Sequence, residues 1–167
     1  MRYILVDRIV HVVHGQFARG CKNVTQTDEI FDQHFPDLPI MPGCMILEAL
    51  AQLSGLLATA SQDFRVMPVL LMVEKTKFRR LVRPGDQLVL DTRALILTGE
   101  AGRFETQANI AAAPAGATSD TGCLRLAAKA IITLGLVPIS SERQAVIRRK
   151  FELLRGDPYE GLVGTVP

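Results

Sequence analysis

The sequence predicts an α+β protein in which one antiparallel sheet wraps around a central buried helix. Residues 43–58 follow a proline and carry apolar side chains on nearly every face, as a helix enclosed by protein does. Segments rich in Val, Ile and Leu, separated by turn signals, come before and after this helix. The 167 residues, 48% of them hydrophobic, are enough for one substantial core. Because nothing else can cover the helix, the sheet must do so.

The N-terminal residues predict a β-hairpin. Residues 3–13 are rich in Val and Ile, residues 14–16 supply a turn, and residues 17–24 predict the second strand. His11 and His14 lie near this turn with no Cys, Asp or Glu at ligand spacing beside them. This favours ordinary strand-end residues over metal ligands.

Prolines stiffen the connection from the hairpin to the helix. Residues 28–33 predict a loop or short turn, after which Pro36, Pro39 and Pro42 recur at every third position. This spacing prevents a regular helix and favours an extended path. We therefore expect His34 to lie at the start of a stiff segment that leads into the helix.

The remaining strands follow the helix. Pro84 and Gly85 suit the two central positions of a type II turn, because Pro fixes the first φ and Gly accepts the positive second one. Residues 99–102 predict another turn, and residues 114–122 predict a loop of small residues. The strands are predicted at residues 68–78, 87–97, 103–113 and 123–136.

A short amphipathic helix is predicted at the C-terminal end. Ser140 and Glu142 suit its start, three basic residues at 148–150 suit its last turns, and Gly156 comes just after it. We expect residues 1–138 to form one domain, and residues 139–167 to form this helix and a flexible tail.

Composition disfavours several classes of protein. A net charge of +2 is too small to indicate nucleic-acid binding. Three cysteines at unrelated spacings fit neither a metal site nor a disulfide framework, which favours a reducing compartment. Residues 41–60 approach transmembrane length but contain Glu48 and Gln52, which favours a soluble, cytoplasmic protein without membrane contact. The uncovered edge of the sheet predicts a homodimer.

Glu48 is the first candidate for chemistry. Between Asp37 and Asp63 it is the only side chain that carries charge at neutral pH. A carboxylate among apolar neighbours is costly to bury unless it is paired or takes up a proton. Such an acid suits catalysis, although Gln52 or backbone groups could also satisfy it in a purely structural role.

His34 and Glu48 together suit acid–base catalysis. A neutral His34 can accept a proton from carbon, while a protonated Glu48 donates one to a leaving group. The amides of Gly43 and Cys44, at the positive end of the helix, can hold a carbonyl oxygen that gains enolate charge. Gln52 lies one turn after Glu48 on the same face and can orient its carboxyl group.

Two of these residues have simpler interpretations. His34 taken alone would be an ordinary loop histidine. Cys44 could be a nucleophile, since thiols at helix starts are activated, but no base lies at an obvious spacing. A small packing residue that contributes its amide is therefore favoured.

Residues 34–52, HFPDLPIMPGCMILEALAQ, resemble the β-hydroxyacyl-acyl carrier protein dehydratases of fatty acid synthesis, the FabZ type of the hotdog superfamily. The family pattern is HFPxxPxxPG followed by a helix bearing Glu. LVDR near the start, KNVT before the loop, and KFRR leading into RPGDQL agree in the same order. The resemblance runs from about residue 3 to residue 135, without the C-terminal helix and tail.

The resemblance implies a hotdog dimer, often a trimer of dimers, in which His34 of one subunit meets Glu48 of the other. His34 would take the α-carbon proton, Glu48 would serve the leaving β-hydroxyl, and the Gly43 N–H would hold the thioester carbonyl. FabA-type enzymes, which also isomerise the double bond, have Asp at the Glu position, so Glu48 favours simple dehydration. Acyl carrier protein and an acyl thioester are the implied partners, with no cofactor and no metal.

The chain departs from the family pattern at a few positions. Gln33 replaces a usual Gly, and Leu81 replaces a usual Pro. Where the family tends to place aromatic residues that resemble a gate on the acyl tunnel, this chain has Pro68, Val69 and Leu70. The absence of these aromatic residues concerns chain length and lid behaviour, and the catalytic pair is retained.

A dense basic cluster precedes the type II turn and consists of Lys77, Arg79, Arg80 and Arg83. It is either a solvated strand end or a docking patch that attracts the acidic carrier protein. Two other functions stay open. A hotdog thioesterase would release free thiol, and a noncatalytic acyl-binding subunit would bind thioester without turnover. Neither explains the full motif from His34 to Glu48.

Overall fold

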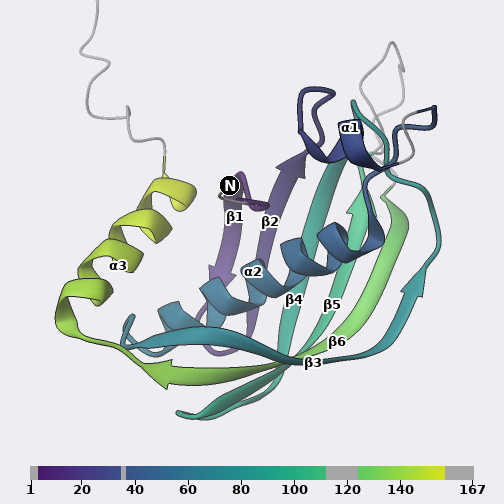
Figure 1. The fold of residues 1–167 in the computed structure, drawn as a ribbon. Helices are drawn as coiled ribbons and strands as arrows, with labels where there is room; N and C mark the ends of the chain where they lie inside the picture. Colours follow the sequence, from purple (N-terminus) through teal and green to yellow (C-terminus); the bar gives the residue numbers. More distant parts are fainter. Residues whose placement is uncertain (1–3, 35–36, 112–123, 157–167) are drawn as a thin grey trace, which may run out of the picture.

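The computed structural model describes residues 4–34, 37–111 and 124–156. These residues form a six-stranded antiparallel sheet, in the order β1-β2-β4-β5-β6-β3, that curves around the long helix α2 (Figure 1). The predicted α+β hotdog fold is therefore confirmed. The strands are β1 (Arg8–Val13), β2 (Phe17–Asn23), β3 (Val66–Phe78), β4 (Gln87–Leu97), β5 (Ala101–Ile110) and β6 (Arg125–Pro138), and the helices are α1 (Ile30–Gln33), α2 (Gly43–Ser61) and α3 (Ser141–Arg155).

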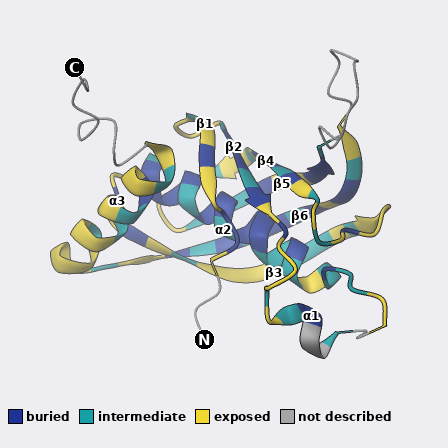
Figure 2. Cartoon of the chain, turned by 90° about the horizontal axis from the view of Figure 1, so that it is seen from above, coloured by how far each residue is buried: buried dark blue, intermediate teal, exposed yellow. Residues whose placement is uncertain are grey.

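Helix α2 is the centre of the core. Leu50, Leu53 and Leu57 are fully buried, and each such side chain stabilises the fold by about 1.5–3 kcal/mol. Figure 2 shows the helix buried along most of its length. By length and composition α2 could cross a membrane, and it is the one helix of the described residues that could, but most of it is buried as in a soluble core helix.

The helix α2 runs three residues further than predicted. The backbone N–H of Gln62 donates to the carbonyl of Ala58 at 3.1 Å, and that of Phe64 donates to Thr59 at 2.8 Å. Asp63 and Phe64 then adopt positive φ values of 51° and 64°. These two left-handed residues end the helix. The prediction placed its end too early because it relied on the polar residues 61–63.

One polar contact crosses the apolar core. The hydroxyl oxygens of Ser54 on α2 and Thr92 on β4 lie 2.7 Å apart, and both residues are fully buried. Ser54 also donates to the carbonyl of Leu50 at 2.8 Å. Both hydroxyls are thus satisfied where α2 meets the sheet.

The strands agree with the prediction except at their ends. β1 begins at Arg8 rather than at residue 3, and β3 begins at Val66 and so includes Pro68. Proline is tolerated there because β3 is an edge strand. The N–H of Asp86 donates to the carbonyl of Arg83 at 3.0 Å, and Gly85 has a φ of 93°, so the predicted type II turn is confirmed. The predicted loop at residues 114–122 lies outside the described residues.

The predicted C-terminal helix forms α3, between Ser140 and Gly156. Its Phe151 is 3% exposed and packs edge-on against Phe64, with ring centroids 5.3 Å apart. The guanidinium of Arg148 lies 4.7 Å from the centroid of Phe64. These contacts join α3 to the residues that end α2. The predicted tail, residues 157–167, lies outside the described residues.

Candidate active site

The start of α2 lies at the surface, with Gly43 half-buried and Cys44 exposed. Pro42 precedes the helix with φ −56° and ψ 139°, and its carbonyl accepts the N–H of Met45 at 2.9 Å. Among the described residues no side chain caps this end, and no acidic residue stands in the first turn. The first amides, those of Gly43 and Cys44, thus remain at the positive end of the helix for an acceptor such as a carbonyl oxygen.

Two chain segments border this helix start. The N–H of Met41 donates to the carbonyl of Val82 at 2.8 Å, which joins the segment before α2 to the segment after β3. The ring of Phe78, the last residue of β3, lies against Gly43. A Cβ at position 43 would come within 2.8 Å of that ring, so any other residue there would require the Phe78 ring to move.

Glu48 lies on the uncovered side of α2. Its exposure is intermediate, so the expectation of a fully buried acid is wrong for a single chain. Met45, Glu48, Gln52 and Leu56 are all half-buried. Because they recur at helical spacing, they form one stripe that the sheet of the same chain leaves partly open. We call these four residues the open stripe.

Gln52 fixes the carboxyl group of Glu48. Its side-chain amide donates to Glu48 Oε1 at 3.0 Å, and its Oε1 accepts the backbone N–H of Leu5 at 2.9 Å. The amide group is therefore held at both ends, so that it orients the carboxyl group. The spacing of these residues on one helix face had suggested the contact between Gln52 and Glu48, but not the contact with Leu5.

His34 lies at the end of α1. Its backbone leaves the helix in an extended conformation, with φ −123° and ψ 105°, and its side chain is half-buried. The next two residues of the motif, at positions 35 and 36, lie outside the described residues, as does the side chain of Gln33. The expected stiff connector is described from residue 37 onward.

The basic cluster borders the start of α2. Lys77 and Arg79 lie on either side of Phe78 in the chain, and the N–H of Arg79 donates to the carbonyl of Ala127 at 2.7 Å. All four side chains are exposed, namely Lys77, Arg79, Arg80 and Arg83. The cluster thus lies beside the Phe78 ring at the candidate site.

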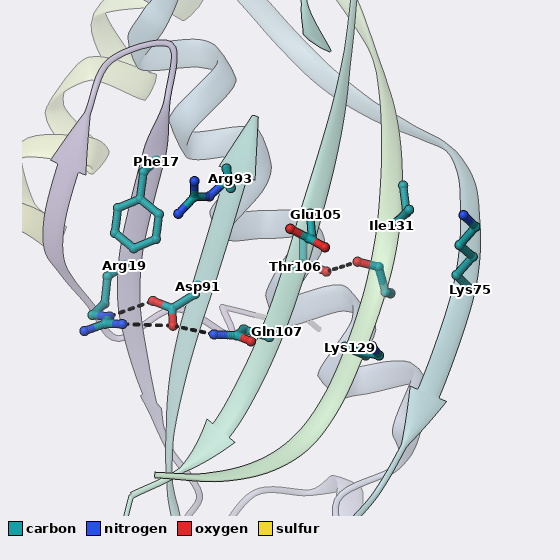
Figure 3. A pocket seen from close by; sticks show the side chains of 11 residues that line it. Phe17, Arg19, Lys75, Asp91, Arg93, Glu105, Thr106, Gln107, Lys129 and Ile131 are labelled. Carbon is teal, nitrogen blue, oxygen red and sulfur yellow. Dashed lines mark hydrogen bonds and ion pairs between the residues drawn. The ribbon is translucent and has the colours of Figure 1, made fainter. Parts of the chain in front are cut away.

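A second polar region was not predicted from the sequence. A groove of about 550 Å³ lies on the face of the sheet opposite α2, and its side chains come from five strands (Figure 3). Arg19 donates to both carboxylate oxygens of Asp91, at 2.6 and 3.0 Å, and Gln107 donates to Asp91 at 3.2 Å. The hydrogen bond with Asp91 raises the pKa of Arg19 above its ordinary value.

None of the predicted site residues lines this groove. Arg19, Asp91 and Gln107 stand opposite one another in neighbouring strands, as cross-strand pairs on a sheet surface do. The groove is therefore a charged sheet face, separate from the candidate site at the start of α2. Among the described residues, no group of three or more His, Cys, Asp or Glu side chains could hold a metal ion.

Comparison with known sequences gives the family. The profile of the FabA-like domain matches residues 1–114. The chain belongs to the FabA-like family. A FabZ 3-hydroxyacyl-acyl-carrier-protein dehydratase of Caldicellulosiruptor bescii is 38% identical over 109 residues, which cover 65% of this chain and 78% of the relative. The FabZ of Syntrophobacter fumaroxidans is 44% identical over 108 residues, covering 64% and 73%. The resemblance inferred from the motif is confirmed.

Solved structures of low sequence identity share the fold of this FabA-like chain. The dehydratase heterocomplex ApeI:P of Xenorhabdus doucetiae matches with a TM-score of 0.60 at 14% identity, covering 87% of this chain and 89% of the other. A Streptococcus mutans protein bound to acetyl CoA matches with a TM-score of 0.59 at 16% identity, covering 83% and 94%. At such identities these matches support the fold alone.

Proposed function

We propose that this FabA-like protein dehydrates a 3-hydroxyacyl thioester to the trans-2-enoyl thioester in fatty acid or related acyl-chain synthesis. Membership of the family, with relatives named as FabZ dehydratases, carries the proposal. The geometry supports it, because an uncapped helix start and an oriented carboxyl group lie on the same helix. Both are parts that an elimination next to a carbonyl group requires.

The proposed reaction uses one base, one acid and two amides. A neutral imidazole of His34 takes a proton from the α-carbon, and the electron pair of that C–H bond moves toward the thioester carbonyl. The N–H groups of Gly43 and Cys44 stabilise the enolate oxygen. The electrons then form the α,β double bond, while the β-hydroxyl accepts the proton of Glu48 and leaves as water. Gln52 keeps the carboxyl group of Glu48 in place.

A second copy of the chain would complete the site. Strand β3 pairs with β6 on one side only, and its outer edge is unpaired among the described strands. Several side chains in its first half are apolar and exposed, namely Met67, Val69, Leu70, Leu71 and Met72. Pairing of two β3 edges would cover these residues. We expect the same contact to cover the open stripe, so that His34 of one subunit meets Glu48 of the other, in a dimer or in a trimer of such dimers.

The thioester carrier is proposed to be acyl carrier protein. The exposed basic cluster lies beside the helix start, where it would attract an acidic carrier and bring the thioester to Gly43. We place the reaction in the cytoplasm. This is supported by burial of α2 and by the free thiols of Cys21 and Cys44.

The test is an assay of the purified protein with 3-hydroxybutyryl thioesters of acyl carrier protein and of coenzyme A. We expect the absorbance of the conjugated enoyl thioester to rise without release of thiol, and faster with the carrier-protein thioester. Release of thiol from a saturated acyl thioester would instead make the protein a thioesterase. Thioester binding without turnover would make it a noncatalytic subunit.

A further inference from the structure

The ring of Phe78 occupies an unusual place for an apolar side chain. Phe78 ends β3, and 51% of its surface is exposed. Yet the tip of its ring touches the first residue of α2. A Cβ on Gly43 would lie 2.8 Å from Cζ of the ring, 2.9 Å from Cε1 and 3.2 Å from Cε2. The ring therefore fills the space beside Gly43, while about half of it stays open.

The backbone on both sides of the ring holds it there. Phe78 pairs with Ala128 on β6, and the next residue, Arg79, donates its N–H to Ala127 at 2.7 Å. A few residues later the carbonyl of Val82 accepts the N–H of Met41, just before α2 begins. The ring thus lies between two fixed backbone contacts, which suits a residue that positions a ligand.

We propose that Phe78 is a positioning residue that forms one wall of the thioester site, which is an inference that rests on the proposed function. A carbonyl oxygen that accepts the N–H of Gly43 must lie next to the ring, because the ring fills the space beside this residue. The ring packs against the flat, apolar thioester group, holds it near the amide, and keeps water away. Amide stabilisation of an enolate is stronger where water is excluded.

The proposal predicts how substitutions of Phe78 change the kinetics. In Phe78→Ala the thioester is held loosely, so kcat/KM falls by about tenfold or more, and saturated butyryl thioester inhibits less tightly. Water reaches the carbonyl, so the ratio of released thiol to enoyl product rises. Phe78→Leu restores part of the loss. Leu81→Ala is the matched control, since Leu81 is 55% exposed in the same segment, and its kinetics stay at the wild-type level.

A double-mutant cycle tests the contact itself. In Gly43→Ala the new methyl group displaces the ring, so the same kinetic loss is expected. In Gly43→Ala combined with Phe78→Ala the methyl group has room, so the second substitution costs less than it does alone. Additive losses would overturn the pairing of ring and glycine.

Fold and assembly are measured on every variant by thermal unfolding and sedimentation. The proposal is overturned if folded Phe78→Ala has wild-type kinetics and inhibition. It is equally overturned if the loss only follows unfolding or dissociation of the oligomer, since the ring would then be structural. If the wild-type protein shows no dehydration, the proposed function fails. In that case calorimetry with butyryl thioester still tests the role of Phe78. Equal affinities of the wild type and Phe78→Ala would contradict the proposal that the ring forms a wall of the thioester site.

Discussion

Two polar regions of this protein differ in almost every respect. The groove on the outer face is rich in charge, and its ion pair of Arg19 and Asp91 is complete within one chain. The start of α2 has an uncapped end with the exposed basic cluster beside it, and the open stripe is covered only in part by the same chain. Arg19 and Asp91 of the groove are paired across neighbouring strands, whereas Glu48 lies on an apolar helix, where an unpaired charge is costly. A groove rich in charged side chains is therefore not where we expect the chemistry.

The largest expected effect is the loss of kcat when the carboxyl group of Glu48 becomes an amide, compared with the same change in the groove. Glu48→Gln keeps the shape of the side chain but cannot donate an acidic proton, so kcat should fall by about 10²–10⁴-fold. His34→Ala should cause a loss of similar size. Enoyl product formation is measured at saturating substrate. The matched control is Asp91→Asn in the groove, which should leave kcat within about twofold of the wild-type value. If Glu48→Gln also kept kcat within about twofold of wild type, Glu48 would have no part in the mechanism.

The next prediction tests whether the site, unlike the groove, needs a second chain. Leu71 is 64% exposed on the β3 edge, and a carboxylate there would face its own copy across a paired edge. We expect Leu71→Glu to give monomers by sedimentation and to lower kcat/KM by about tenfold or more, because the catalytic pair is split.

The opposite edge strand supplies the control for Leu71→Glu. Val10 is 59% exposed on β1, so Val10→Glu introduces the same charge at the other end of the sheet. It should change neither the assembly nor the activity. Monomers that keep full activity after Leu71→Glu would show that one chain contains a whole site.

A smaller effect is expected on the stability of the groove. Asp91 is 5% exposed and accepts hydrogen bonds from Arg19 and Gln107. Asp91→Asn leaves the guanidinium without its charged partner, so the free energy of unfolding should fall by about 1–3 kcal/mol. Urea unfolding at neutral pH measures this loss. Glu74→Gln, in the more exposed ion pair with Arg103, should cost at most about 1 kcal/mol; equal losses would contradict the role of burial.

The smallest effect concerns the thiols. Burial is the main cause that raises the pKa of Cys21, with the charge of Asp7 as a further cause. A raised pKa leaves less thiolate at a given pH, so Cys21 should react slowly with iodoacetamide and keep gaining rate as pH rises beyond the usual thiol range. Peptide mass spectrometry measures the rate. The exposed Cys44 should react sooner, and butyryl thioester should protect Cys44 alone; equal protection of both thiols would contradict this placement.

The sequence predicted those features that depend on local pattern. Gly85 at a type II turn, the apolar faces of α2, and the spacing of Glu48 and Gln52 on one helix face need no information from other strands. The extent of α2 was predicted too short, because the end of the helix depends on a left-handed Phe64, a residue type that gives no local sign of this conformation.

Features that depend on strand register were missed. Arg19 and Asp91 are far apart in the chain and meet only because β2 pairs with β4 in one register. The contact of Phe78 with Gly43 likewise depends on where β3 ends relative to the start of α2. The partial exposure of Glu48 was missed because hydrophobic pattern cannot distinguish burial by the same chain from burial by a second copy. The catalytic roles of His34 and Glu48 stay predictions.

The hydrogen bond between Ser54 and Thr92 has a consequence for how tolerant this core is to change. Rotating α2 about its axis would separate the two hydroxyls. Ser54 would keep its hydrogen bond to the Leu50 carbonyl of the same helix, but the buried Thr92 hydroxyl would lose its partner, at a cost of about 1–3 kcal/mol. Leucine side chains pack nearly as well at several rotations of α2 about its axis, but the hydrogen bond between Ser54 and Thr92 forms at only one of them. The hydrogen bond between Ser54 and Thr92 thus fixes the direction in which the Glu48 side chain leaves the helix. A redesign that enlarges the acyl-binding space can therefore replace the surrounding aliphatic residues more safely than Ser54 or Thr92.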